Sequence, residues 1–152
     1  MSLEVGNIAP VFYGITMVPT TVWREYGYAL LTIAGADGEV SDPELEWLTI
    51  QCAEYVGVEE SVIAEWEEFD FEEAALEEIF HSFNTKSFAN FNKLLIYDAI
   101  RMCSADGEYA QDEKESVYKA AQLLNVSPET VMAIEALVDI EEAANKLRMT
   151  VL

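Results

Sequence analysis

Two short acidic segments of the 152-residue chain contain residue types that bind divalent cations. The first, Ala-Asp-Gly-Glu-Val, occupies positions 36–40, and the second, Ala-Asp-Gly-Glu-Tyr, occupies positions 105–109. In each copy a glutamate follows the aspartate by seven residues. Hard divalent ions need several oxygen ligands at one point, and the glycine permits a sharp turn that gathers such ligands. The candidate metal ligands are Asp37, Glu44, Asp106 and Glu113.

The spacing matches only the second half of a calcium loop of the EF-hand type. The first half of such a loop also supplies oxygen ligands, but Ile33 and Gly35 stand at those positions in the first copy. Met102 and Ser104 stand there in the second copy, within a segment that the apolar pattern assigns to a helix. A true EF-hand is therefore excluded.

Each acidic residue also has an ordinary structural explanation. Glu44 can complete a capping box with Ser41 at the start of a helix, and the aspartates can accept local amide hydrogens in the turns. In the second copy Ala110 replaces Ser41 and cannot cap through its side chain, yet Glu113 is still present. That difference favours a role beyond capping, but the residues alone leave both a structural turn and a cation site open.

The elements that position these segments are expected to be helices, because apolar residues recur at helical spacing along nearly the whole chain. The expected helices contain, in order, Val22 to Ile33, Leu45 to Val56, Val62 to Trp66, Ala75 to Phe83, Phe88 to Ile100, Val117 to Leu124, Val131 to Val138, and a last segment that runs to Leu147. Pro43 suits the first turn of the second helix, and Gly57 and Asn125 suit helix ends because both tolerate positive φ.

The two acidic segments belong to a longer internal repeat with an offset of 69 residues, since the Ala-Asp-Gly-Glu matches continue to the later glutamates and to Leu48 and Val117. We therefore predict an all-α fold, a single compact bundle of about seven to eight helices with pseudo-twofold internal symmetry. The predicted single domain covers residues 1–152. Its repeats span roughly 20–69 and 88–139, and residues 1–18 form an N-terminal arm.

The charge balance limits the partners. With 29 acidic and 8 basic residues the formal net charge is −21, which opposes direct binding to nucleic acid or to an anionic bilayer. Cations and basic proteins are the expected partners, and the sequence leaves the oligomeric state undetermined. Residues 5–23 carry no charge, but Gly6, Pro10, Gly14 and Pro19 interrupt them, so we expect neither a signal peptide nor membrane insertion.

Two cysteines, Cys52 and Cys103, lie within apolar helical patterns and are expected to be reduced and buried, which suits a cytoplasmic protein. Asp98 interrupts an apolar run and is expected to pair with Arg101 one turn later. His81 is the only histidine, so a histidine-rich zinc or iron site is excluded.

The doubled motif, in an all-helical chain of this length, resembles the TerB-like tellurite-resistance proteins. The resemblance covers roughly residues 20–140. It implies a compact bundle of two related helical halves and a soluble bacterial protein of a metal-linked stress response, with a proposed role in binding divalent metal. On this resemblance Asp37 and Glu44 match the motif in the first half, and Asp106 and Glu113 match it in the second. Glu39 and Glu108 fill a variable place in the motif and are weaker ligand candidates.

Three functions follow as hypotheses. The first is a non-catalytic module in which calcium, magnesium, zinc or manganese joins the two acidic turns. The second is an adaptor without metal, whose acidic region or uncharged N-terminal arm holds a basic or membrane-associated protein partner. The third, a carboxylate-dependent hydrolase, is the weakest, because no nucleophile beside a base and no phosphate-binding loop accompanies the acids.

Overall fold

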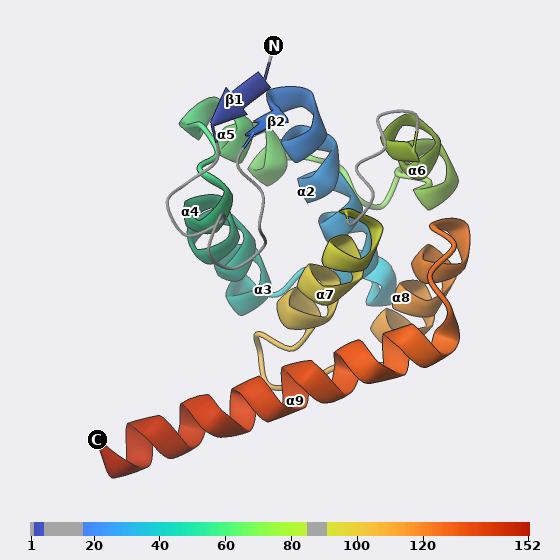
Figure 1. Ribbon diagram of the computed structural model, residues 1–152. Helices are drawn as coiled ribbons and strands as arrows, with labels where there is room; N and C mark the ends of the chain where they lie inside the picture. The colour runs from blue at the N-terminus through green and yellow to red at the C-terminus, as the bar shows by residue number, and fades with distance from the viewer. Residues whose placement is uncertain (1, 5–16, 85–90) are drawn as a thin grey trace.

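The computed structural model describes residues 2–4, 17–84 and 91–152. Its elements in chain order are β1 (Ser2–Glu4), β2 (Met17–Pro19), α2 (Thr20–Ala34), the 3-10 turn η1 (Gly35–Asp37), α3 (Asp42–Glu46), the π-helical segment η2 (Trp47–Cys52), α4 (Ala53–Val56), α5 (Glu60–Glu68), α6 (Leu76–Asn84), α7 (Phe91–Cys103), α8 (Gln111–Leu123) and α9 (Pro128–Val151). The predicted all-α bundle is confirmed (Figure 1). The strand pair β1 and β2 is a short antiparallel ladder in which Leu3 is the backbone partner of Val18.

The first half runs from α2 through the acidic turn into a helical stretch formed by α3, η2 and α4. Ser41 caps this stretch and Pro43 lies in its first turn, as predicted. Gly38 ends the turn with φ 96°, and Gly57 ends α4 with φ 70°. Both values lie in the left-handed region that favours glycine, so the predicted stops are confirmed.

The second half repeats this plan with α7, an acidic turn and α8. Gly107 has φ 86° at the position equivalent to Gly38, and Asn125 follows α8 with φ 59°. The predicted stop at Asn125 is therefore confirmed, since asparagine tolerates this conformation better than most residues. Phe88, which was expected within α7, lies outside the described residues.

The core forms around α2, which packs against α5, α6, α7 and α8. Its buried residues include Val22, Tyr26, Leu30 and Ile33, which recur at helical spacing in the sequence. Gly27 lets α5 approach closely, because a Cβ atom there would lie 2.1 Å from the Trp66 indole ring. That indole is held in place by the hydrogen bond that its N–H donates to the Arg24 carbonyl oxygen at 3.1 Å.

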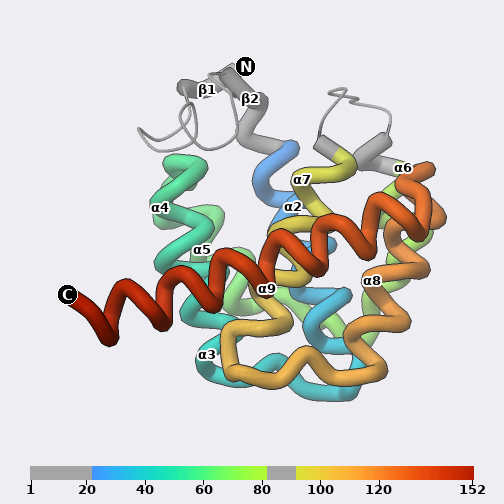
Figure 2. Tube along the Cα trace, turned by 60° about the horizontal axis from the view of Figure 1, so that its bottom comes forward, coloured from blue at the N-terminus to red at the C-terminus, as the bar shows by residue number. Residues whose placement is uncertain are grey.

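The last helix differs from the prediction. Two helices were expected after Ser127, but α9 is continuous from Pro128 to Val151, so the expected break is wrong. The sequence after Val138 has no proline or glycine and is rich in alanine, glutamate and leucine, which favour helix continuation. Figure 2 shows α9 crossing α7 and α8 and extending beyond them toward the C-terminus.

Among the described residues, no helix has the length and apolar character needed to span a bilayer.

Candidate metal site

The packing of the two halves brings their acidic turns together. The first turn, η1, packs against α8, whose first turn contains Glu113. Reciprocally, α3, which contains Glu44, packs against α7, the helix that precedes the second turn. Each acidic segment therefore lies against the opposite half of the molecule, as the pseudo-twofold repeat requires (Figure 1).

The two later glutamates are the buried members of the site. Glu44 is 3% exposed and Glu113 is 1% exposed, which is rare for glutamate without a compensating charge. An oxygen of Glu44 accepts the Ser41 backbone N–H at 3.3 Å, and Oε1 of Glu113 accepts the Ala110 backbone N–H at 2.9 Å. Oε2 of Glu113 is buried and accepts no N–H or O–H hydrogen bond from the described part of the chain, and the Cys103 thiol is a further, weaker donor beside this carboxylate.

The contact of Glu113 revises one inference from the sequence. Ala110 was expected to remove the capping explanation because its side chain cannot accept a hydrogen bond. However, the reciprocal half of a capping box needs only a backbone N–H, which Ala110 supplies. Glu113 therefore caps its helix as Glu44 does, and the missing hydroxyl does not by itself indicate another function.

The aspartates lie in exposed turns. Asp37 accepts the Glu39 N–H at 3.0 Å, and Asp106 accepts the Glu108 N–H at 2.9 Å. Glu39 and Glu108 are themselves exposed. The two aspartates thus stabilise their own turns in the same way, and Oδ1 of each is engaged by a local amide.

The site carries unfavourable negative charge. Burial, together with the charges of Glu113 and Asp106, raises the pKa of Glu44 to about 8, against the lowering effect of the Ser41 amide. Burial also raises the pKa of Glu113, and Asp37 and Asp106 act in the same direction, while the Ala110 amide opposes the shift. The four sequence-predicted ligands are therefore within electrostatic range across the two halves.

The donor set suits a hard cation, although its present arrangement is incomplete. Within the described residues, no three Asp, Glu, His or Cys side chains converge closely enough to hold a metal ion. Oε2 of Glu113 supplies one buried oxygen without an N–H or O–H donor from the described residues, and carboxylate oxygens are the ligands that calcium, magnesium and manganese prefer. A cation at this point needs the aspartate side chains to turn from their own amides.

Cys103 lies beside this group. Burial raises the pKa of its thiol well above the ordinary value, and the neighbouring Glu113 charge raises it further. Cys52 and Cys103 are both free and buried, so the predicted burial is confirmed. A thiol held in its neutral form is a poor metal ligand, because the thiolate is the binding species.

A second polar cluster beside the turns was only partly foreseen. Asp98 is fully buried, and Arg101 pairs with it at 3.3 Å, as predicted. The sequence did not indicate that the Tyr26 hydroxyl, from α2, also donates to Asp98 at 2.5 Å. Tyr26 looked like a core aromatic, and only the packing of α2 on α7 joins it to Asp98.

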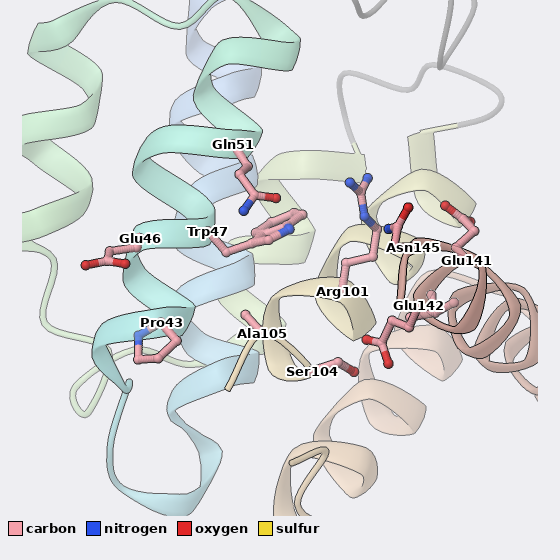
Figure 3. A pocket seen from close by; sticks show the side chains of 11 residues that line it. Pro43, Glu46, Trp47, Gln51, Arg101, Ser104, Ala105, Glu141, Glu142 and Asn145 are labelled. Atoms are coloured by element: carbon pink, nitrogen blue, oxygen red, sulfur yellow. The ribbon is translucent and has the colours of Figure 1, made fainter. Parts of the chain in front are cut away.

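The Arg101 guanidinium is enclosed by aromatic rings, with Trp47 at 5.2 Å, Tyr55 at 5.4 Å and Tyr97 at 4.9 Å from the ring centroids. Figure 3 shows Arg101 between Trp47 and the α9 residues Glu141 and Asn145, where these side chains line a hollow. Aromatic faces attract a guanidinium electrostatically. The cluster therefore joins η2, α4 and α7, and the hydrogen bond from Tyr97 to Glu141 connects it to α9.

Comparison with known proteins gives two matches. The family model described as "Tellurite resistance protein TerB" matches residues 29–136. A crystal structure of a tellurite resistance protein from Nostoc punctiforme PCC 73102 is similar at 31% sequence identity and a TM-score of 0.79, and the match covers 93% of this chain and 87% of that one. No curated protein sequence matches the chain.

Proposed function

Because the chain belongs to the TerB family of tellurite resistance proteins, we propose that it is a non-catalytic stress-response module that binds a divalent cation between its two acidic turns. Asp37 and Glu44 of the first half, and Asp106 and Glu113 of the second, are the proposed ligands. The observation that carries the proposal is the buried pair Glu44 and Glu113, whose charged forms repel each other in the absence of a counterion.

A divalent cation relieves this repulsion and joins the two halves at their contact. Calcium, magnesium and manganese fit the oxygen donors best, whereas zinc usually takes nitrogen or sulfur ligands. Binding requires both glutamates in their charged form. Because the pKa of Glu44 is raised, protons compete with the cation near neutral pH, and affinity increases as the pH rises.

The non-catalytic part of the proposal is supported by access. The two glutamates are 3% and 1% exposed, and each also accepts the backbone N–H at the start of its own helix. An ion can reach such oxygens, but a larger substrate cannot touch them without opening the helix ends. General acid–base catalysis requires that contact.

We further propose a cytoplasmic location, which the two buried, unpaired thiols support.

The deciding experiment is isothermal titration of the metal-free protein with each of the four cations, together with thermal unfolding. We expect heat and a raised melting temperature for at least one cation, because a ligand that binds only the folded state stabilises it. The double variant Glu44→Gln with Glu113→Gln should lose both signals. Its matched control, Glu39→Gln with Glu108→Gln, removes the same charge from exposed positions of the same turns and should keep them. Absence of heat and thermal shift with all four cations would remove the proposal.

A second candidate is the adaptor, favoured by four exposed acids, of which Glu67 and Glu68 end α5 while Glu72 and Glu73 lie between α5 and α6. Such a surface attracts a basic protein partner, and added salt weakens the binding because it screens the charges. Neutralising these four residues should abolish partner capture, while the Glu44 and Glu113 variants should leave it unchanged. If the Glu44 and Glu113 variants lose partner capture and the variant of the four exposed acids keeps it, the partner binds at the proposed metal site.

A further inference from the structure

The exposed apolar residues of α9 include a line along one side of the helix. Its members are spaced alternately by four and three residues, and they are Ala133, Leu137, Ile140, Ala144, Leu147 and Val151. All six are exposed, and the three largest of the distal part, Ile140, Leu147 and Val151, are 66%, 62% and 65% exposed. This spacing is the a and d pattern of a coiled coil, here extending over about 27 Å of helix. We call these six residues the α9 seam.

The α9 seam is separate from the face that holds α9 on the bundle. Val131 and Val138 are buried against the body, and the Tyr97 hydroxyl donates to Glu141 at 2.7 Å. At 3.6 residues per turn, Val131 and Val138 lie about 0.4 of a turn from the middle of the seam, and Glu141 lies about 0.2 of a turn from it. The seam can therefore pair with another helix without lifting α9 from α7 and α8. Figures 1 and 2 show the C-terminal end of α9 extending past the bundle.

We propose that the α9 seam pairs with the α9 seam of a second copy of this chain, in antiparallel orientation. The charges beside the seam favour this occupant. Glu141 and Arg148 occupy the same heptad position, one repeat apart and on the same flank of the seam. An antiparallel pair with Ala144 packed beside Leu147 of the other copy places Arg148 of each copy next to Glu141 of the other, twice by symmetry.

A parallel pair lacks this complementarity. It sets the flank of Glu141 and Arg148 against the other flank of the partner helix, which carries the uncharged residues Ala136, Ala143 and Thr150. In the antiparallel pair Ile140, Ala144, Leu147 and Val151 form the apolar contact. Ala143 of each copy then faces Thr150 of the other, and these small residues permit close approach of the two helices, since interaxial distance depends on the side chains at the contact.

The net charge sets the salt dependence. Two copies, each with a formal charge of −21, repel each other electrostatically, and this repulsion acts over a longer range than the apolar contacts between the seams. Added salt screens this repulsion more than it weakens an apolar seam, so dimer formation should strengthen as salt rises. A basic protein partner on the same surface would show the reverse dependence.

The test is sedimentation equilibrium of the full chain over a concentration series at low and moderate salt. We expect a monomer–dimer equilibrium that salt shifts toward dimer. Leu147→Glu should weaken the dimer by about tenfold or more, because it places a charge in the seam. The matched control is Met149→Glu, since Met149 is 85% exposed but lies off the seam, and it should leave the equilibrium unchanged. A chain that stays monomeric, or equal effects of the two variants, would overturn the proposal.

The orientation has its own test. Arg148→Glu and Glu141→Arg should each weaken self-association, and an equimolar mixture of the two should recover it as a heterodimer, because each contact then joins opposite charges. Because Glu141→Arg also removes the acceptor of the Tyr97 hydroxyl, thermal unfolding of both variants, compared with Tyr97→Phe, checks that α9 remains packed on the bundle. If the mixture shows no recovery while the wild-type chain dimerises, the antiparallel register is wrong.

Discussion

Glu44 and Glu113 occupy equivalent positions in the two halves, and the charge of Glu113 adds to burial in raising the pKa of Glu44 to about 8. Each residue starts its own helix by accepting a backbone N–H. The same two glutamates therefore fix local structure and accumulate charge where the halves meet. Stability, proton binding and cation binding should all depend on this pair.

The pH dependence of unfolding follows from the sign of these shifts. The pKa of Glu44 is about 8 in the folded protein against an ordinary 4.5, so the folded state holds a proton that the unfolded state releases. This stabilisation is complete below the unfolded value and is lost as pH rises through about 8. Without metal, the melting temperature should fall between pH 6 and 8.5, where ordinary carboxylates no longer titrate. Each kcal/mol lost corresponds to about 2–4 °C.

Glu44→Gln should flatten this pH dependence, because the neutral amide resembles the protonated acid in size and charge. The variant should exceed the wild-type melting temperature at pH 8.5, and exposed Glu39→Gln should retain the wild-type slope. A wild-type melting temperature that rises steadily from pH 6 to 8.5 would contradict the raised pKa values.

Gly27→Ala should destabilise the protein although alanine favours helices. The new methyl group would lie 2.1 Å from the Trp66 ring, which is itself buried and hydrogen-bonded to Arg24. Overpacking of this kind costs about 1–3 kcal/mol, which exceeds the gain of up to about 1 kcal/mol in helix propensity. Urea unfolding measures the difference, and the double variant Gly27→Ala with Trp66→Phe tests whether the indole is the obstacle.

The buried carboxylate of Asp98 should be sensitive to loss of its partners. Tyr26→Phe removes one donor to a charged group and should cost about 1.5–3 kcal/mol of unfolding free energy. Asp98→Ala leaves the Arg101 guanidinium without this partner and should cost about 3–5 kcal/mol. If Tyr26→Phe lowers the unfolding free energy by less than about 1.5 kcal/mol, Asp98 contributes little to the packing of α2 on α7.

Alanine in place of either turn glycine should destabilise the protein through backbone strain and not through a steric clash. A Cβ atom at Gly38 or Gly107 meets nothing within 4 Å, so the cost of Gly107→Ala comes from its φ of 86°. We expect a loss of about 1–2 kcal/mol, and a smaller one for Gly107→Asn, since asparagine tolerates this region better. Equal losses for alanine and asparagine would contradict this explanation. Thermal or urea unfolding gives both values.

The sequence was sufficient for much of the scaffold because its signals are local. Apolar spacing placed the helices, Ser41 and Pro43 marked a helix start, and Gly57 and Asn125 marked helix ends. These features depend on backbone preferences within one or two turns of helix. The expected break after Val138 was wrong because no residue there stops a helix, and helices continue where nothing interrupts them.

The site itself depended on contacts between segments that are distant in the chain. Sequence spacing identified four equivalent-looking carboxylates, but only the packing of η1 on α8 and of α3 on α7 separates two exposed turn aspartates from two buried glutamates. Likewise, the heptad spacing of α9 can be read from the sequence. That the α9 seam is exposed follows only from the structure, in which another face of α9 packs on α7. Local preference fixes where a helix forms; burial, charge coupling and accessibility arise from what the rest of the chain places against it.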